Sequence, residues 1–390
     1  MSVTAAQGFR AGSAAAGLAA RGGVDLTVVI NDGEVIPAAC VFTTNKAKAH
    51  PILWSQQVIA SGSARAVVLN AGGANCFTGP EGFALTHSSA ETLAGLLDNT
   101  GASEVLVCST GLIGEPLPAG AVIQGIERAV ALADKGEDAG IAASQAILTT
   151  DSRPKTSVVT MDVDGAEVII GGMAKGAGML APGLATMLVV ITTDAVLEAS
   201  QLDKALRDAT RVTFDRLDSD GAMSTNDQVT LMASGASGVT PDLKAFGDAL
   251  TSLCADLAQQ LLADAEGSSH DITITVTGAG SEDDAVAVGR AVARNNLFKA
   301  AMFGQDPNWG RVLAAIGTVD AEFDVYAVDV SMNGVRVCHA GAPDRPRSEV
   351  DLSARAIEVL IELNAGDHHA SIWTNDLTHA YVHENSAYSS

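Results

Sequence analysis

Hydrophobic and polar positions along the first half of the chain follow two different spacings. Short runs of β-branched and aliphatic residues bounded by turn residues are typical of buried strands, and they lie at 25–30, 64–69 and 104–109. Apolar residues that recur every three or four positions predict amphipathic helices at 88–97, 121–133 and 139–148. The segment 157–172 predicts a hairpin, because Asp164-Gly165 suits a two-residue turn between twisted strands.

The second half of the chain opens with an apolar strand pattern at 186–194 and then repeats the same two spacings. Helical spacing predicts helices at 202–217, 241–265 and 282–294. Strand patterns lie at 271–278, 323–330, 334–340, 358–363 and 370–376. Pro241 is expected in the first turn of its helix, and Asp306 is expected to cap a helix that starts at Pro307. The alternation predicts an α/β protein whose last third is a strand-rich second unit.

The amino-acid composition argues against some classes of binding partner. The chain has 390 residues, of which 47% are hydrophobic and 18% charged, so it can bury the cores of two or more domains. Its 46 acidic and 23 basic residues leave a net charge of −23, which repels phosphate backbones and anionic lipid. We therefore expect no nucleic-acid partner and no membrane partner, whereas a cationic substrate is compatible with this charge.

Cysteines and histidines show no signature of a metal site or of a disulfide framework. The five cysteines are widely spaced and include no C-x-x-C pair, which favours buried thiols in a reducing cytoplasm. The segment 218–227 lacks the glycine and glutamate positions of a calcium loop. His379 and His383 are four residues apart, but a metal site there would need a third ligand. We expect a cytoplasmic protein without a metal site.

The segment 175–190, KGAGMLAPGLATMLVV, places glycines and a proline before an Ala-Thr pair that opens an apolar strand. One interpretation is a loop that enters the core, with Thr186 as the first strand residue. The other is that the Ala185–Thr186 bond is cut, which makes Thr186 an N-terminal nucleophile. Its free α-amine, with an ordinary pKa of about 7.7–8.0, can then take the proton of the hydroxyl on the same residue.

A second candidate lies in CSTGLIGEPLP, residues 108–118, directly after a predicted strand. Thr110 and Gly111 offer a hydroxyl and a flexible backbone N–H, which are suitable donors for an oxyanion hole. An ordinary turn at a strand end explains the same residues. The glycine-rich segment 70–79 matches neither a dinucleotide fingerprint nor a phosphate-binding loop, and the chain has no G-x-S-x-G serine motif.

Several of these segments also carry a family resemblance. The chain resembles the ornithine acetyltransferases of arginine biosynthesis, also called glutamate N-acetyltransferases, over essentially its whole length. Seven motifs carry the resemblance. They are GMAKGAGMLAPGLATML (172–188), STGLIG (109–114), TTDSRPK (149–155), STND (224–227), DAEGSS (264–269), DPNWGR (306–311) and ENSAYSS (384–390).

The resemblance implies an α/β fold with an αββα sandwich domain plus a smaller α/β domain. It also implies a precursor that cuts itself between Ala185 and Thr186. The products would be an alpha chain, 1–185, and a beta chain, 186–390, which both contribute to the active site. Two alpha and two beta chains would associate into a heterotetramer.

The same resemblance implies a ping-pong reaction. N2-acetylornithine donates its acetyl group to Thr186, ornithine leaves, and glutamate collects the acetyl group as N-acetylglutamate. Thr110 and Gly111 would form the oxyanion hole. Substrate contacts would fall on Thr149, Lys175, Thr186, Glu266, Asn385 and Ser390. No cofactor is implied, and the resemblance leaves open whether acetyl-CoA is an alternative acetyl donor.

This sequence departs from the family pattern at a few positions. Gly183 stands where Asn, Asp or Ser is commoner, Gly73 and Ala265 replace Asn and Gly, and His270 replaces Lys. None of these changes removes a residue with a named chemical role. Two other hypotheses remain at this point. A related self-processing amidase or aminopeptidase would pass the acyl group to water, and a non-catalytic binding protein would keep the Ala185–Thr186 bond intact.

Overall fold

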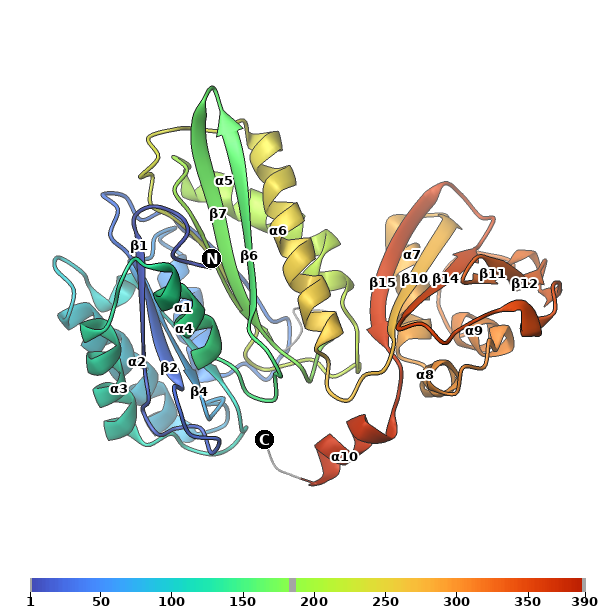
Figure 1. Ribbon diagram of the computed structural model, residues 1–390, viewed down its shortest axis with the longest axis horizontal. Coiled ribbons are helices and arrows are strands. Elements are labelled where there is room, and N and C mark those ends of the chain that lie inside the picture. Colours follow the sequence, from blue (N-terminus) through green and yellow to red (C-terminus); the bar gives the residue numbers. More distant parts are fainter. Residues whose placement is uncertain (1, 182–186, 388–390) are drawn as a thin grey trace.

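The computed structural model describes residues 2–181 and 187–387, and these form two α/β units (Figure 1). The strands of the first unit are β1 (Phe9–Ala14), β2 (Leu26–Asn31), β3 (Ala38–Phe42), β4 (Ala66–Ala71), β5 (Val105–Thr110), β6 (Lys155–Val163), β7 (Ala166–Lys175), β8 (Leu188–Thr193) and β9 (Gln228–Ala233). Within the described residues they make a first sheet, in the order β1-β2-β4-β5, and a second sheet, in the order β3-β9-β8-β7-β6.

The helices of the first unit cover the outer faces and the edges of these sheets. They are α1 (His50–Ile59), α2 (Gly79–Gly95), α3 (Ala119–Ala131), α4 (Glu137–Ala146), α5 (Ala199–Val212) and α6 (Leu243–Ala263). α2 and α3 share a core with the first sheet, and α5 and α6 share one with the second. α4 lies along the edge strand β1 and α1 along the edge strand β5, which protects both edges of the first sheet.

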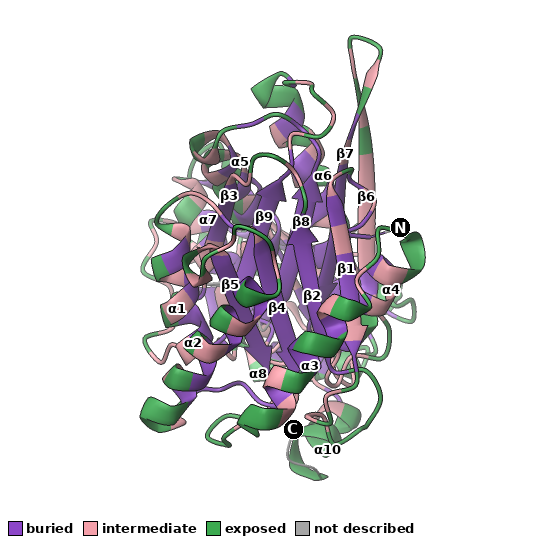
Figure 2. Cartoon of the chain, turned by 90° about the vertical axis from the view of Figure 1, so that its left-hand side faces the viewer, coloured by how far each residue is buried: buried purple, intermediate pink, exposed green. Residues whose placement is uncertain are grey.

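The two sheets pack face to face, because successive side chains of a strand point to opposite faces. On β4, Val67 and Leu69 share a core with Val190 of β8 in the second sheet. The intervening Val68 points the other way, into the core under α2 and α3. On β8, Val189 likewise points away, toward α5 and α6. The described residues thus form the expected αββα sandwich, and Figure 2 shows its sheets as the buried centre.

The second unit is a smaller α/β layer, as the resemblance implies. Its strands are β10 (Asp271–Ala279), β11 (Asp329–Met332), β12 (Val335–His339), β13 (Ala342–Pro343), β14 (Ala356–Glu362) and β15 (His368–Asn375), in the order β13-β12-β11-β14-β10-β15. Its helices α7 (Glu282–Ala293), α8 (Asn296–Phe303) and α9 (Trp309–Ile316) bury one apolar face on this sheet. The last described helix, α10 (His379–Ala387), leaves β15 and runs back toward the first unit (Figure 1).

Most of the predicted elements are confirmed. The strands expected at 25–30, 64–69 and 104–109 are β2, β4 and β5, each shifted by one or two residues. The predicted hairpin is formed by β6 and β7, and its turn residues Asp164 and Gly165 both have positive φ, at 54° and 85°. A turn with positive φ at both positions matches the twist of the two strands. No described helix has both the length and the apolarity to cross a membrane.

Three predicted helix starts were wrong. Asp242 rather than Pro241 precedes the first residue of α6, because its carboxylate accepts the Ala245 N–H at 2.9 Å. For α9 the cap is Asn308 instead of Asp306, since the Asn308 side chain accepts the Arg311 N–H at 3.3 Å. The helix predicted at 88–97 already begins at Gly79, because Pro80 is tolerated in a first helical turn.

The strand predicted at 323–330 was also placed too early. A 3₁₀ turn, Val325–Ala327, lies in the middle of that segment, and β11 begins only at Asp329. The Asp324 carboxylate accepts the Tyr326 N–H at 2.9 Å, which stabilises the turn instead of an extended strand. Three further 3₁₀ turns lie at Ala102–Glu104, Phe214–Arg216 and Arg347–Glu349 within the described residues.

Candidate active site

A cavity of about 330 Å³ lies between the sandwich and α10. Its lining includes every predicted site residue that the structure describes: Thr110, Gly111, Thr149, Lys175, Glu266 and Asn385. Ala185, Thr186 and Ser390 lie outside the described residues. The lining comes from both sides of the predicted cleavage point, since Lys175 precedes that point and Glu266 follows it.

The wall that carries Thr110 and Gly111 is made by two loops in close contact. Thr110 is the last residue of β5, and its carbonyl accepts the Gly72 N–H at 2.9 Å. Gly111 has a φ of 128°, and a Cβ there would lie 2.6 Å from the Gly73 nitrogen. Only glycine permits both this conformation and this approach. The fold therefore fixes the backbone at the position predicted for an oxyanion hole.

Lys175 ends β7 and brings a buried cation to this wall. Its side chain is 2% exposed, and its Nζ donates to Thr149 Oγ1 at 2.8 Å and to Thr110 Oγ1 at 3.2 Å. Asp151 Oδ2 lies 3.8 Å from the same nitrogen. Burial lowers the pKa of Lys175, and the Asp151 carboxylate opposes this lowering. The ammonium is thus held by two hydroxyls and a neighbouring carboxylate.

Asp151 is the centre of a buried ion network behind the cavity. Its Oδ1 accepts Lys155 Nζ and the Gly176 N–H, both at 2.6 Å, and its Oδ2 accepts the Thr149 N–H at 3.0 Å. Lys155 also reaches Asp264 at 2.5 Å. Burial alone would raise the pKa of Asp151, but the charges of Lys175 and Lys155 and these hydrogen bonds lower it to about 2.

Another part of the cavity lining is acidic. Glu266 follows α6, and its N–H donates to the Ala177 carbonyl at 2.9 Å. Asn385 on α10 donates through Nδ2 to Glu266 Oε2, also at 2.9 Å. Gly178 leaves room for this carboxylate, because a Cβ there would lie 2.5 Å from Glu266 Oε1. The Glu266 carboxylate is therefore placed by contacts on both sides.

Two further groups extend this acidic wall. Burial raises the pKa of Asp220, although its oxygens accept the Met179 and Ala222 N–H groups at 2.7 and 3.1 Å. Burial also raises the pKa of Tyr381 to about 12, and the negative charges of Asp220 and Glu266 add to that shift. The cavity lining consequently combines a buried cation, Lys175, with the carboxylates of Glu266 and Asp220.

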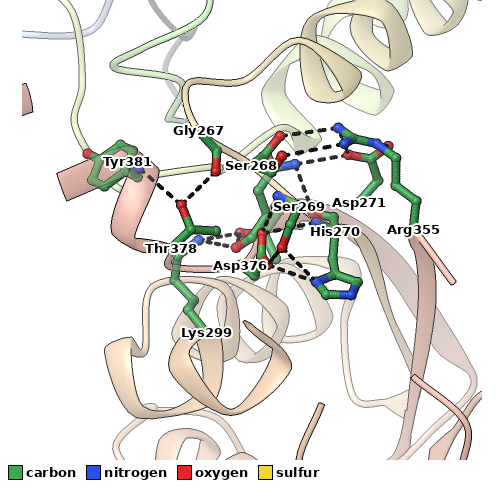
Figure 3. A network of polar contacts seen from close by, with 12 residues as sticks. Gly267, Ser268, Ser269, His270, Asp271, Lys299, Arg355, Asp376, Thr378 and Tyr381 are labelled. Carbon is green, nitrogen blue, oxygen red and sulfur yellow. Dashed lines mark hydrogen bonds and ion pairs between the residues drawn. The ribbon is translucent and has the colours of Figure 1, made fainter. Parts of the chain in front are cut away.

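A polar network holds the Glu266 loop and α10 together (Figure 3). Thr378 donates through Oγ1 to the Gly267 carbonyl at 2.6 Å and accepts the Tyr381 N–H at 3.0 Å. Asp376 accepts the His270 N–H at 3.0 Å and lies 2.8 Å from His270 Nδ1. Burial raises the pKa of Asp376, but hydrogen bonds from Ser269 and His270 outweigh it and lower the pKa. His270 therefore pairs with a carboxylate, as a lysine could.

Some lining residues were missed from the sequence. They are mainly Arg21, Gly72, Gly178, Met179, Asp220 and Tyr381. Asp220 lies in the acidic segment that was compared only with a calcium loop, and Gly178 lies in the glycine-rich segment before the predicted cleavage point. Both segments stood out by composition, but neither pattern says that the two chain regions meet. Arg21 and Tyr381 have no comparable signal.

Comparison with known families decides the assignment. A family model described as "ArgJ family" matches residues 10–390. This chain belongs to the ArgJ family. Proteins named arginine biosynthesis bifunctional protein ArgJ are 58% identical in Streptomyces coelicolor and 57% identical in Streptomyces avermitilis. Each similarity covers 390 residues and 100% of both chains.

Among solved structures, an ornithine acetyltransferase from Mycobacterium tuberculosis, complexed with ornithine, is 46% identical and has a TM-score of 0.43. The match covers 48% of this chain and 96% of that chain. ArgJ family membership confirms the resemblance to ornithine acetyltransferases. The individual roles of the cavity residues stay predictions.

Proposed function

We propose that this chain transfers an acetyl group from N2-acetylornithine to glutamate in arginine biosynthesis. The observation that carries the proposal is the cavity in which Thr110, Gly111, Lys175 and Glu266 meet, in a chain that belongs to the ArgJ family. Its curated relatives are named as arginine biosynthesis proteins over their whole length. These names do not favour the self-processing amidase hypothesis.

The charges of the cavity suit amino-acid substrates. Ornithine carries ammonium groups and a carboxylate, and glutamate carries one ammonium group and two carboxylates. Glu266 and Asp220 can accept hydrogen bonds from an ammonium group, while Arg21 lines the same cavity and can pair with a carboxylate. N2-acetylornithine keeps one ammonium group and one carboxylate, so it has no net charge, and its side-chain ammonium group can pair with the carboxylates of this cavity.

The proposed chemistry uses Thr186 as an N-terminal nucleophile. In maturation, the Thr186 hydroxyl attacks the Ala185 carbonyl, the acyl group moves from nitrogen to oxygen, and water hydrolyses the resulting ester. The released α-amine then takes the Thr186 hydroxyl proton as Oγ bonds to the acetyl carbon of acetylornithine. The acetyl C–N bond breaks, and the same proton passes to the leaving ornithine nitrogen. Glutamate's amine repeats these steps in reverse and frees Thr186.

Thr110 and Gly111 are proposed to hold the oxyanion of each tetrahedral intermediate. A preorganised donor pair stabilises charge that appears only in the transition state, so it raises the rate without tighter ground-state binding. Thr149, Glu266, Asn385 and Ser390 are proposed as substrate contacts, while Lys175 already donates to the hydroxyls of Thr110 and Thr149. The chains 1–185 and 186–390 would both be needed, in a cytoplasmic heterotetramer of two alpha and two beta chains.

The proposal is tested by following the acetyl group. Purified protein is incubated with N2-acetylornithine and isotopically labelled glutamate, and the products are measured by mass spectrometry. Ornithine and labelled N-acetylglutamate are expected in equal amounts. Acetate and ornithine without N-acetylglutamate would instead identify an amidase. A parallel reaction with acetyl-CoA and glutamate tests whether acetyl-CoA is an alternative donor, which we propose because the relatives are named bifunctional.

A further inference from the structure

The hydrogen bonds of Lys175 differ from those expected of a lysine whose ammonium group is free to bind a substrate carboxylate. Its Nζ already donates to the hydroxyls of Thr110 and Thr149, at 3.2 and 2.8 Å, and the side chain is 2% exposed. An ammonium group has three hydrogens, and these contacts use two of them. Asp151 Oδ2 lies 3.8 Å from the same nitrogen, at an ion-pair distance. Two hydroxyls and a carboxylate of the protein therefore already surround this cation.

The contact with Thr110 has a direct consequence for that hydroxyl. Because Thr110 Oγ1 accepts a hydrogen bond from Lys175, its own hydrogen must point elsewhere. Among the described residues, Thr110 Oγ1 donates to no acceptor, and Thr110 lines the cavity. A hydroxyl that accepts from a cation is also a stronger donor, because hydrogen bonds in a chain polarise one another. Thr110 is thus left with one polarised donor hydrogen for a ligand.

We propose that Lys175 acts on acetyl transfer through Thr110, by orienting and polarising the hydroxyl that stabilises the oxyanion. This inference rests on the proposed function and assigns Lys175 a role other than pairing with a substrate carboxylate. Lys175 is a positioning residue in this account, and Thr110 is the group that touches the reacting oxygen.

Asp151 and Lys155 hold Lys175 and Thr149 in place. Asp151 binds the Gly176 N–H at 2.6 Å, directly after Lys175, and the Thr149 N–H at 3.0 Å. It therefore fixes the backbone beside the lysine and beside the lysine's other hydroxyl partner. Lys155, whose side chain is fully buried, binds Asp151, with 2.6 Å between Lys155 Nζ and Asp151 Oδ1. A fully buried carboxylate that is bound on both oxygens has little freedom to move.

The test uses an acetyl donor that has no carboxylate. p-Nitrophenyl acetate acetylates the enzyme and releases nitrophenolate, so its rate reports the oxyanion hole without any carboxylate contact. We expect Thr110→Val to lower this rate by roughly 100-fold or more, as for loss of an oxyanion donor. Lys175→Met should lower it by about 10-fold, since charge-assisted hydrogen bonds are roughly twice as strong as neutral ones. Lys244→Met, at an exposed lysine on α6, is the matched control and should match the wild type.

A double-mutant cycle tests whether Lys175 works through Thr110. In the Thr110→Val background, Lys175→Met should have no further effect, because the hydroxyl on which it acts is absent. Asp151→Asn should behave in the same way, with a smaller effect in the wild-type background. With acetylornithine, Lys175→Met should lower kcat with little change in KM. Self-cleavage between Ala185 and Thr186 is also an acyl transfer, and it involves no substrate carboxylate. For a variant that matures too slowly for the p-nitrophenyl acetate assay, the rate of chain cleavage is therefore compared across the same single and double variants.

Two results would overturn the inference. One is a Lys175→Met enzyme that handles p-nitrophenyl acetate at the wild-type rate and shows only a raised KM for acetylornithine, which identifies a carboxylate-binding lysine. The other is a double variant whose loss equals the product of the single losses, which means independent action. Failure of the proposed function looks different, because the wild type would then form no N-acetylglutamate whatever the Lys175 variant does with p-nitrophenyl acetate.

Discussion

The buried ion network behind the cavity predicts a large loss of stability for Lys155→Met. Lys155 is fully buried and is the cation within 2.6 Å of both Asp151 and Asp264. Removal of one partner of a buried pair leaves uncompensated charge and typically costs about 3–5 kcal/mol. We expect a fall of this size in the free energy of unfolding at pH 7, measured by urea titration. Lys244→Met removes an exposed pair with Asp248, so it should cost less than about 1 kcal/mol.

The pH dependence of this loss follows from Asp151. Its folded pKa of about 2 lies below the ordinary 3.8, which corresponds to about 2 kcal/mol of stability from the ionised group. A lowered carboxyl pKa stabilises the fold above pH 3.8, and this contribution is lost as the pH falls through 2. Without Lys155 the carboxylate protonates more readily, so the gap between wild type and variant should be smaller at pH 3 than at pH 7. A Lys155→Met loss below about 1 kcal/mol at pH 7, or one independent of pH, would refute this reasoning.

Three further substitutions test the site. Gly178→Ala places a Cβ 2.5 Å from Glu266 Oε1, so the carboxylate must move. The KM for acetylornithine should therefore rise by about 10-fold or more, with a smaller change in kcat. An unchanged KM in steady-state assays would contradict this prediction. Gly267 has a φ of 60°, and a Cβ at this position would press on the Tyr381 backbone. We therefore expect Gly267→Ala to detach α10, so that limited proteolysis cuts the chain beyond Thr378 faster than in the wild type. Thr186→Ala should abolish both chain cleavage and acetyl transfer, measured by gel electrophoresis and product analysis, and an uncleaved but fully active variant would refute the nucleophile assignment.

Much of the fold could be predicted because local patterns agree with the tertiary environment. The runs at 25–30 and 104–109 are mainly apolar, and each becomes a strand buried on both faces within the sandwich. Asp164-Gly165 predicted its hairpin because few turns accept positive φ at two successive residues. Helix starts such as that of α6 were missed, since Pro241 and Asp242 both suit a helix N-terminus and only the hydrogen bond to Ala245 separates them.

The site was predictable as a set of residues and not as a geometry. Periodicity placed Thr110 at a strand end, and the family resemblance supplied Lys175, Glu266 and Asn385. No local pattern states that α10 returns from the second unit to place Asn385 2.9 Å from Glu266. The role of Asp151 was equally hidden, because a carboxylate between two lysines becomes a network only when β6 and β7 pair. Contacts between distant segments depend on the packed structure, which the sequence spacing does not contain.

The most direct test of the account is an intact-mass spectrum, under denaturing conditions, of protein incubated with N2-acetylornithine alone. The account predicts two species that separate between Ala185 and Thr186, with one acetyl group on the chain that begins at Thr186. Glutamate added before denaturation should remove that acetyl group. One species at the full 39.6 kDa, without an acetyl group, would contradict the self-activated threonine and the ping-pong transfer together.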